Sequence, residues 1–173
     1  MSNAHPDPGE KESDRALFML GNGRAEEASA TIARVLLAHP ESPSAHRAMA
    51  MILVHRADFH EAEKSLLLAI RYSPMVNHSC YSELGEVLIQ LGRTEEAVEK
   101  LSVAIESMNA IGDTWELSSA SFARAFANFK LGNFEDALRD LEFVDEGFFY
   151  YGDELWNKSR VLKEISIFSK NRG

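Results

Sequence analysis

The chain has little cysteine and no long apolar run. Cys80 is the single cysteine among 173 residues, so an internal disulfide is excluded, and a lone thiol is typical of a reducing compartment such as the cytoplasm. The apolar stretch 48–54 is far shorter than the roughly 20 residues that a membrane-spanning helix needs. No basic segment followed by an apolar run opens the sequence, so we expect no secretory signal.

Basic charge is also scarce. Lys and Arg number 18 against 27 Asp and Glu, which gives a net charge of −9. Nucleic-acid binding draws most of its affinity from neutralising phosphates with Lys and Arg, and an anionic membrane surface repels an acidic chain. We therefore expect neither nucleic acid nor membrane among the partners.

Motifs that carry catalysis or bind metal are missing from the sequence. It has no phosphate-binding glycine loop and no nucleophile elbow, and His60-Glu61 lacks the second histidine of a His-Glu-x-x-His motif. His55 lies five residues before His60, and His78 lies two before Cys80, so neither pair shares one helix face. We expect no metal, no cofactor and no enzymatic activity.

The remaining composition is that of a globular protein. Hydrophobic residues make up 45% and charged residues 26%, and 173 residues fit one domain. Residues 1–10 are polar and contain Pro6, Pro8 and Gly9, which is typical of a disordered segment or a tag remnant. We expect a single domain over residues 11–173.

A six-residue pattern recurs four times in the sequence. Each copy has a small residue, two turn positions, two residues rich in acid, and an alanine. The copies are Gly23–Ala28, Ala57–Ala62, Gly92–Ala97 and Gly132–Ala137, and their alanines are 34, 35 and 40 residues apart. Glycine tolerates the left-handed conformation that ends a helix, and carboxylates favour the first turn of the next one. The pattern predicts pairs of helices joined by tight turns.

The residues after each alanine support this interpretation. A bulky aliphatic residue follows four positions later in every copy, at Ile32, Leu66, Leu101 and Leu141. Pro40 and Pro74 lie twelve residues past their alanines, where a helix is expected to end. No window alternates well enough to predict a strand, so the chain is predicted to be entirely helical.

The pattern resembles the tetratricopeptide repeat (TPR) family. The best copy of the family signature is Tyr81-x2-Leu84-Gly85-x2-Leu88 followed by Ala97-x3-Leu101. The resemblance implies an all-α, right-handed α-solenoid of antiparallel helix pairs, a TPR-like superhelix. We expect repeats at about 11–42, 43–76, 78–112 and 113–152, and a closing helix at 154–170 that covers the last repeat.

The outer copies depart from the family pattern. Arg15 occupies a leucine position, and Arg124 and Asn128 stand where the family has Leu and Tyr. Either a longer helix exposes Arg124 and Asn128, or they pair with an acid such as Asp136 or Asp140, or they contact a ligand. The 40-residue spacing resembles an extended repeat subtype in which both helices are longer.

In this family the first helices of successive repeats line a concave groove that holds partners. Carried over to this chain, the partner-binding residues are Arg47, Met51, Val54, Glu83, Glu86, Ile89, Phe122, Phe126 and Phe129. The Lys, Asn and Arg clamp that binds the acidic tails of large chaperones is absent from these helices, so we exclude that ligand.

Two features leave alternatives open. Phe122, Phe126 and Phe129 form one stripe on one helix, which is either core under the closing helix or a groove anchor for an amphipathic segment. Phe149 and Tyr150 are unexplained by the repeat and could support self-association.

The expected function is that of a cytoplasmic scaffold or adaptor for a protein or peptide. Glu83 and Glu86 favour an amphipathic partner that carries basic residues. The alternatives are a structural protein that self-associates as a homodimer and a regulatory module that senses a short peptide.

Overall fold

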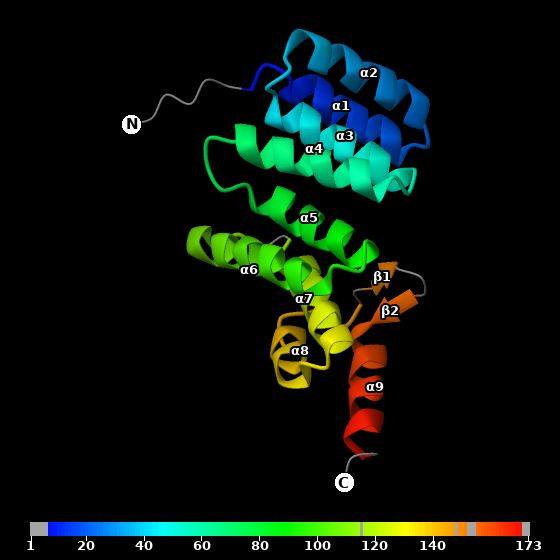
Figure 1. Cartoon of the computed structure of the whole chain (residues 1–173), viewed down its shortest axis with the longest axis vertical. Coiled ribbons are helices and arrows are strands. Elements are labelled where there is room, and N and C mark those ends of the chain that lie inside the picture. The colour runs from blue at the N-terminus through cyan, green and yellow to red at the C-terminus, as the bar shows by residue number, and fades with distance from the viewer. Residues whose placement is uncertain (1–6, 115, 148, 152–154, 171–173) are drawn as a thin grey trace. The chain divides into compact units, whose positions relative to one another are not determined.

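The computed structural model describes residues 7–114, 116–147, 149–151 (backbone only) and 155–170. The contacts within the chain divide it into two compact units, Met1–Cys80 and Tyr81–Gly173 (Figure 1). Each unit is therefore described by itself. In the described part, no helix is both long and apolar enough to cross a membrane.

The first unit is built from two helix pairs. Its helices are α1 (Glu10–Gly21), α2 (Ala25–Ala38), α3 (Pro43–His55) and α4 (Phe59–Tyr72). Helix α3 packs against both helices of the first pair as well as against α4. Small and medium side chains fill the space between them, and this core holds Ala16, Met19, Ala28, Ile32, Ala48 and Ile52.

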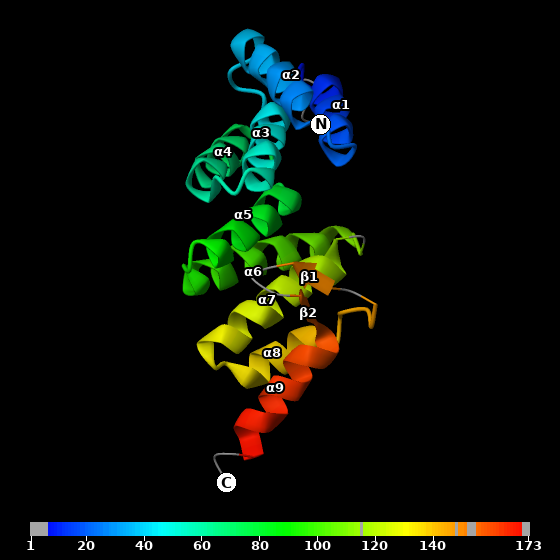
Figure 2. The ribbon, with the colours of Figure 1, turned by 90° about the vertical axis from the view of Figure 1, so that its right-hand side faces the viewer.

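The second unit contains two further helix pairs, a β-hairpin and a final helix. Its elements are α5 (His78–Gln90, which begins just before the boundary), α6 (Thr94–Ile111), α7 (Leu117–Leu131), α8 (Phe134–Leu141), β1 (Phe149–Tyr151), β2 (Leu155–Asn157) and α9 (Lys158–Lys170). Helix α7 packs against α6, α8 and α9, and Figure 2 shows α7, α8 and α9 side by side.

The turns inside the helix pairs adopt the predicted conformation. Gly23, Gly92 and Gly132 have φ angles of +74°, +75° and +79°, a region that L side chains rarely adopt. In the second copy Ala57 takes the same place with φ +60°. The backbone therefore keeps one turn geometry even where glycine is missing.

The alanines of the repeat pattern are all buried. Ala28, Ala62, Ala97 and Ala137 are inaccessible to solvent, and so are the aliphatic residues four positions later or nearly so. At Gly85 the packing is tighter still, because an added Cβ atom would lie 2.4 Å from Cγ of Leu101. Small residues at these positions therefore allow the paired helices to approach closely.

Three expectations are corrected in the second unit. The prediction that no strand occurs is wrong, because β1 and β2 pair antiparallel with Tyr150 opposite Trp156. The closing helix begins at Lys158 instead of residue 154, since β2 comes first. The fourth pair does not have two longer helices, because α8 has only 8 residues while α6, in the third pair, has 18. The side chains of Phe149 and Tyr150 lie outside the described part.

The N-terminal segment is also corrected in part. Residues 1–6 lie outside the described part, but α1 begins at Glu10 and Asp7 is held by hydrogen bonds. The Ser42 hydroxyl donates to Asp7 Oδ1 at 2.6 Å and the Ser44 amide to Oδ2 at 2.9 Å. Burial alone raises the pKa of Asp7, but these hydrogen bonds outweigh it and hold the pKa below its ordinary value. Asp7 thus ties the segment before α1 to the start of α3.

Candidate partner-binding site

The second unit contains a small pocket between α5 and the start of α7. Its lining residues on α5 are one helical turn apart, and those at the start of α7 are three positions apart. We call it the acidic pocket, and it has a volume of about 180 Å³ and is lined by Ser82, Glu83, Glu86, Glu116 and Ser119. Among the described residues, no Lys, Arg or His lines it.

Among the described residues that line the acidic pocket, no basic side chain neutralises the carboxylate of Glu86. Burial, and to a smaller extent the nearby carboxylates of Glu83 and Glu116, raise the pKa of Glu86 to about 7. Burial and like charge both penalise the ionised form. Near neutral pH this carboxyl group is therefore divided between its protonated and ionised forms.

The structure places three of the predicted contact residues in the core. Ile89 is 5% exposed, Phe122 is fully buried and Phe126 is 1% exposed, so a partner cannot reach them on the folded chain. The expectation that these side chains line an open groove is wrong. For Phe122 and Phe126 the alternative interpretation, a stripe of core residues, describes the structure.

Strand β2 and helix α9 together cover the phenylalanine stripe of α7. The Trp156 ring lies 5.0 Å from Phe126 and 5.6 Å from Phe129, measured between ring centroids. Phe168 of α9 contacts Phe129 edge-on at 6.5 Å. Such pairs add to burial of the rings, so the aromatic cluster holds the hairpin and α9 against α7. Phe129 remains partly buried at the edge of this cluster.

In the first unit, the predicted contact residues lie on α3. Arg47, Met51 and Val54 are partly buried and spaced by four and three residues, which places them on one face of the helix. Of the predicted set, Glu83 and Glu86 lie together in the acidic pocket of the second unit.

The substitutions that break the repeat pattern in the fourth copy form a polar cluster. Arg124 donates two hydrogen bonds to the Asp140 carboxylate, at 2.9 and 2.6 Å, and a third to the Ser102 hydroxyl at 3.0 Å. The expected pairing of Arg124 with Asp140 is confirmed. Asn128 is only 4% exposed, so the idea that a longer helix exposes it is wrong.

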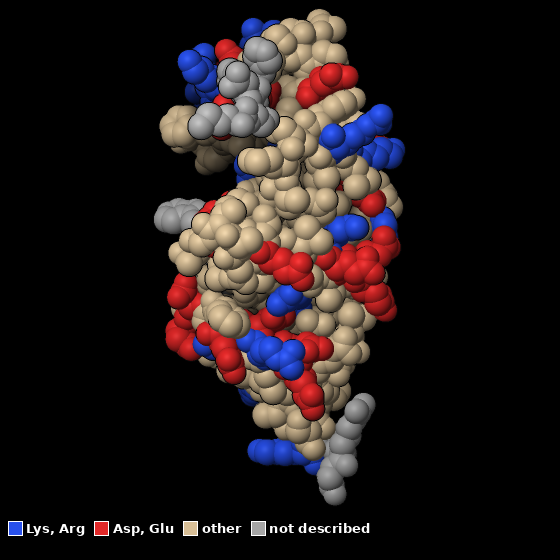
Figure 3. Space-filling model, turned by 90° about the vertical axis from the view of Figure 1, so that its left-hand side faces the viewer, with Lys and Arg blue, Asp and Glu red and all other residues tan. Residues whose placement is uncertain are grey.

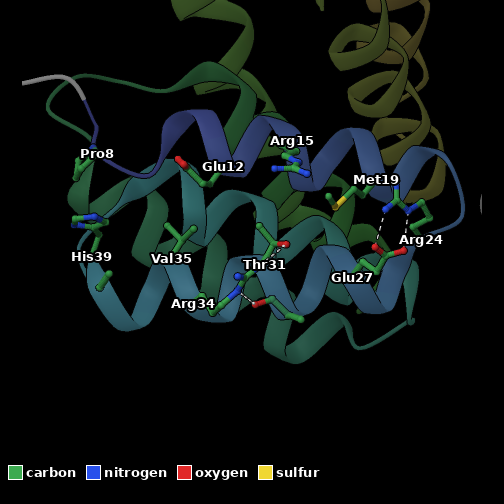
Figure 4. Close-up of a pocket in the computed structure, with 12 residues that line it drawn as sticks. Pro8, Glu12, Arg15, Met19, Arg24, Glu27, Thr31, Arg34, Val35 and His39 are labelled. Carbon is green, nitrogen blue, oxygen red and sulfur yellow. Dashed lines mark hydrogen bonds and ion pairs between the residues drawn. The ribbon is translucent and has the colours of Figure 1, made fainter.

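Arg15 has a simpler explanation. It is exposed and lines a groove of about 660 Å³ between α1 and α2, where Glu12 and Arg15 come from α1 and Thr31 and Arg34 from α2 (Figure 4). A leucine at this position would be exposed to water. The departure from the family pattern therefore follows from an uncovered helix surface.

Sequence reasoning missed Glu116 as a member of the acidic pocket. The residue stands just before α7, in a stretch whose helix start the repeat pattern does not define. The signal was the spacing of the phenylalanine stripe, which leads back from Phe122 through Ser119 to Glu116 in steps of three residues.

No protein-family model matches the chain, and no curated protein matches it either. Several solved structures are similar. YrrB, described as a TPR protein with an unusual peptide-binding site, has a TM-score of 0.64 at 19% identity, over 80% of this chain and 68% of that chain. MamA has a TM-score of 0.69 at 16% identity, over 91% and 84%. PilW, described as a type IV pilus biogenesis factor, has a TM-score of 0.66 at 19% identity, over 76% and 58%.

At these identities the likeness shows the fold. The predicted all-α class of paired helices is confirmed, and the chain is a TPR-like helical repeat protein.

Proposed function

We propose that the chain is a non-catalytic scaffold that binds a segment of another protein. The proposal rests on two accessible surfaces, both on first helices of the repeats. In TPR-like folds these helices hold partners. One face is Arg47, Met51 and Val54 on α3, and the other is the acidic pocket on α5 and α7.

The charge of the second unit sets the chemistry of the partner. In the face that Figure 3 shows, acidic side chains gather over its lower half, where the helices of this unit lie. A segment rich in Lys or Arg complements this surface and associates faster at low salt. Since the chain has a net charge of −9, we expect such a segment to be selected over an acidic one. A cytoplasmic setting, expected from the lone Cys80, fits this function.

The test is capture of partners by the immobilised full chain from a lysate of the source organism, followed by direct binding of the captured protein. Met51→Asp places a charge on the α3 face, and we expect it to reduce binding by at least tenfold with little change in melting temperature. Leu37→Asp is the matched control, because Leu37 is exposed on α2, outside the proposed faces. Equal binding by both variants would remove the α3 face from the proposal.

Self-association is a second candidate function. Several large apolar side chains are exposed near the C-terminal end of the second unit, among them Leu138, Phe143 and Phe168. A second copy of the chain could cover them, as exposed apolar patches favour association. Light scattering over a concentration series tests this, and a mass equal to one chain at all concentrations would exclude it.

The third candidate, a module that senses a short peptide, makes a different prediction. Peptides alone would then raise the melting temperature of the full chain, because ligands that bind only the native state stabilise it. A scaffold for a folded partner would show no such effect with short peptides.

A further inference from the structure

The side chain of Ser82 lines the acidic pocket. Ser82 is 5% exposed and lines the pocket, and its hydroxyl makes no hydrogen bond to any of the described residues. The Ser82 Oγ atom is not fully buried, so it can form a hydrogen bond with water or with an occupant of the pocket. Ser13, a buried serine of α1, instead donates to the carbonyl of Gly9 one turn earlier. The Ser82 hydroxyl is therefore available to the pocket.

Two carboxyl groups in the same pocket are also unpaired. Neither Glu86 nor Glu116 has an ion-pair or hydrogen-bond partner within the described part of the chain. Two acids in the first turns of α2 and α6 are paired instead, Glu27 with Arg24 and Glu96 with Arg93. The pocket therefore concentrates hydrogen-bond acceptors and negative charge, and supplies no positive charge of its own.

The chemistry of the lining selects the class of occupant. An anion is excluded by three glutamates, and an apolar group would leave them unsolvated. In the described residues, no group of three or more His, Cys, Asp or Glu side chains is placed to hold a metal ion. An organic cation does not need several ligands arranged around one point, as a metal ion does. An ammonium group has three N–H donors, and each can bind a separate acceptor.

We propose that the acidic pocket binds the side-chain cation of a lysine or arginine residue from the partner segment, with Glu86 and Glu116 as the charged acceptors and the Ser82 hydroxyl as a neutral one. This inference deepens the proposed function and rests on it for the source of the cation. Glu83 and Ser119 complete the wall of the pocket.

Binding of the cation should favour the ionised form of Glu86, so the carboxyl group releases its proton on binding. The groups that face Glu86 are Glu83 on the same helix and Glu116 at the start of α7, and both are acidic. With a pKa of about 7, the ionised fraction of Glu86 rises roughly tenfold between pH 6 and pH 8. Affinity for the cation should rise about tenfold over the same range.

The experiment is a titration of the full chain with n-butylammonium and with n-butylguanidinium, followed by NMR of the backbone amides and of the glutamate side-chain carboxyl carbons. We expect the resonances of Ser82, Glu86, Glu116 and Ser119 to shift, and the pKa of Glu86 to fall towards its ordinary value. Comparison of the two cations distinguishes a lysine from an arginine. n-Butanol is the uncharged control and should produce no shift.

Glu86→Gln is the decisive variant, because glutamine keeps the shape of the side chain and removes its charge. We expect at least tenfold weaker binding of both cations and loss of the pH dependence, while the folded chain becomes more stable at pH 8. Glu99→Gln, an exposed glutamate on α6, is the matched control and should bind as the wild type does.

Three results would overturn the inference: no shift with either cation, unchanged binding by Glu86→Gln, or stronger shifts at the same residues with Ca²⁺ or Mg²⁺ than with the organic cations. The outcome is separable from that of the proposed function. If partner proteins are captured equally by wild type and Glu86→Gln, the scaffold function stands and the cation pocket fails. If butylammonium binds but no partner is captured, the pocket stands and the scaffold function fails.

Discussion

At the scale of single residues, Ala57 marks the place where the repeat turn lacks its glycine. An L-residue in the left-handed region costs about 1–2 kcal/mol of conformational strain, which glycine avoids. Glycine in turn costs about 0.5–1 kcal/mol, because its unfolded chain has the larger conformational entropy. With φ +60° at Ala57, we expect Ala57→Gly to raise the free energy of unfolding by about 0.5–1 kcal/mol. Denaturant titration measures this change.

The control for this prediction is the reverse substitution at an equivalent turn. Gly92 has φ +75° and nothing within 4 Å of the position of an added Cβ atom. Gly92→Ala therefore introduces only backbone strain and should lower stability by about 1 kcal/mol. If both substitutions change stability in the same direction, turn geometry does not explain either.

Gly85 illustrates a different demand on a small residue, which is the close approach of α5 and α6. An alanine Cβ would lie 2.4 Å from Cγ of Leu101, so either the Leu101 side chain or the helices themselves must shift. Despite the better helix propensity of alanine, we expect Gly85→Ala to lower stability by about 1–2 kcal/mol in thermal or denaturant unfolding. Gly21→Ala, where no atom lies within 4 Å, should instead be neutral or stabilising.

At the scale of elements, the ion pair between Arg124 and Asp140 joins α7 to α8. The Asp140 side chain is only 6% exposed, so removal of its partner leaves a buried carboxylate unpaired. We expect Arg124→Leu, which restores the family residue, to lower stability by about 3 kcal/mol. Adding Asp140→Ala should recover part of this loss, and a double-mutant cycle in denaturant measures the coupling. Additive losses would mean that the pair contributes nothing specific.

The elements also show how far the sequence predicts the structure. The turn and alanine pattern predicts all four helix pairs, because those positions are constrained by local backbone geometry and by close packing. The hairpin is different. Its strands have three residues each, too few for an alternating pattern, and they are held by contact of Trp156 with α7. The same contact buries Phe126. The periodicity of α7 alone does not predict this burial.

At the scale of the whole molecule, the acidic pocket makes stability depend on pH. Because the pKa of Glu86 in the folded chain is raised to about 7, the folded state holds this proton more tightly than the unfolded state. The contribution of Glu86 to stability is fully present below its unfolded pKa and is lost as pH rises through about 7. We expect Glu86→Gln to be about 1–3 kcal/mol more stable than wild type at pH 8 and equal to it at pH 4.

Unfolding by denaturant at several pH values checks this prediction. The wild-type free energy of unfolding should fall between pH 5 and pH 8 relative to that of Glu86→Gln. A constant difference between the two proteins over this range would mean that Glu86 has an ordinary pKa in the folded chain.

Because Trp156 packs against Phe126 and Phe129, its fluorescence reports on the contact between the hairpin and α7. The indole N–H is buried without a hydrogen-bond partner among the described residues, and the Arg160 guanidinium lies 4.1 Å from the ring centroid. Indole emission depends on hydration and on nearby charge, so release of the hairpin from α7 would change its colour and intensity. Since the chain has two tryptophans, Trp115→Phe leaves one emitter. Stopped-flow fluorescence could then time the detachment of the C-terminal elements separately from global unfolding.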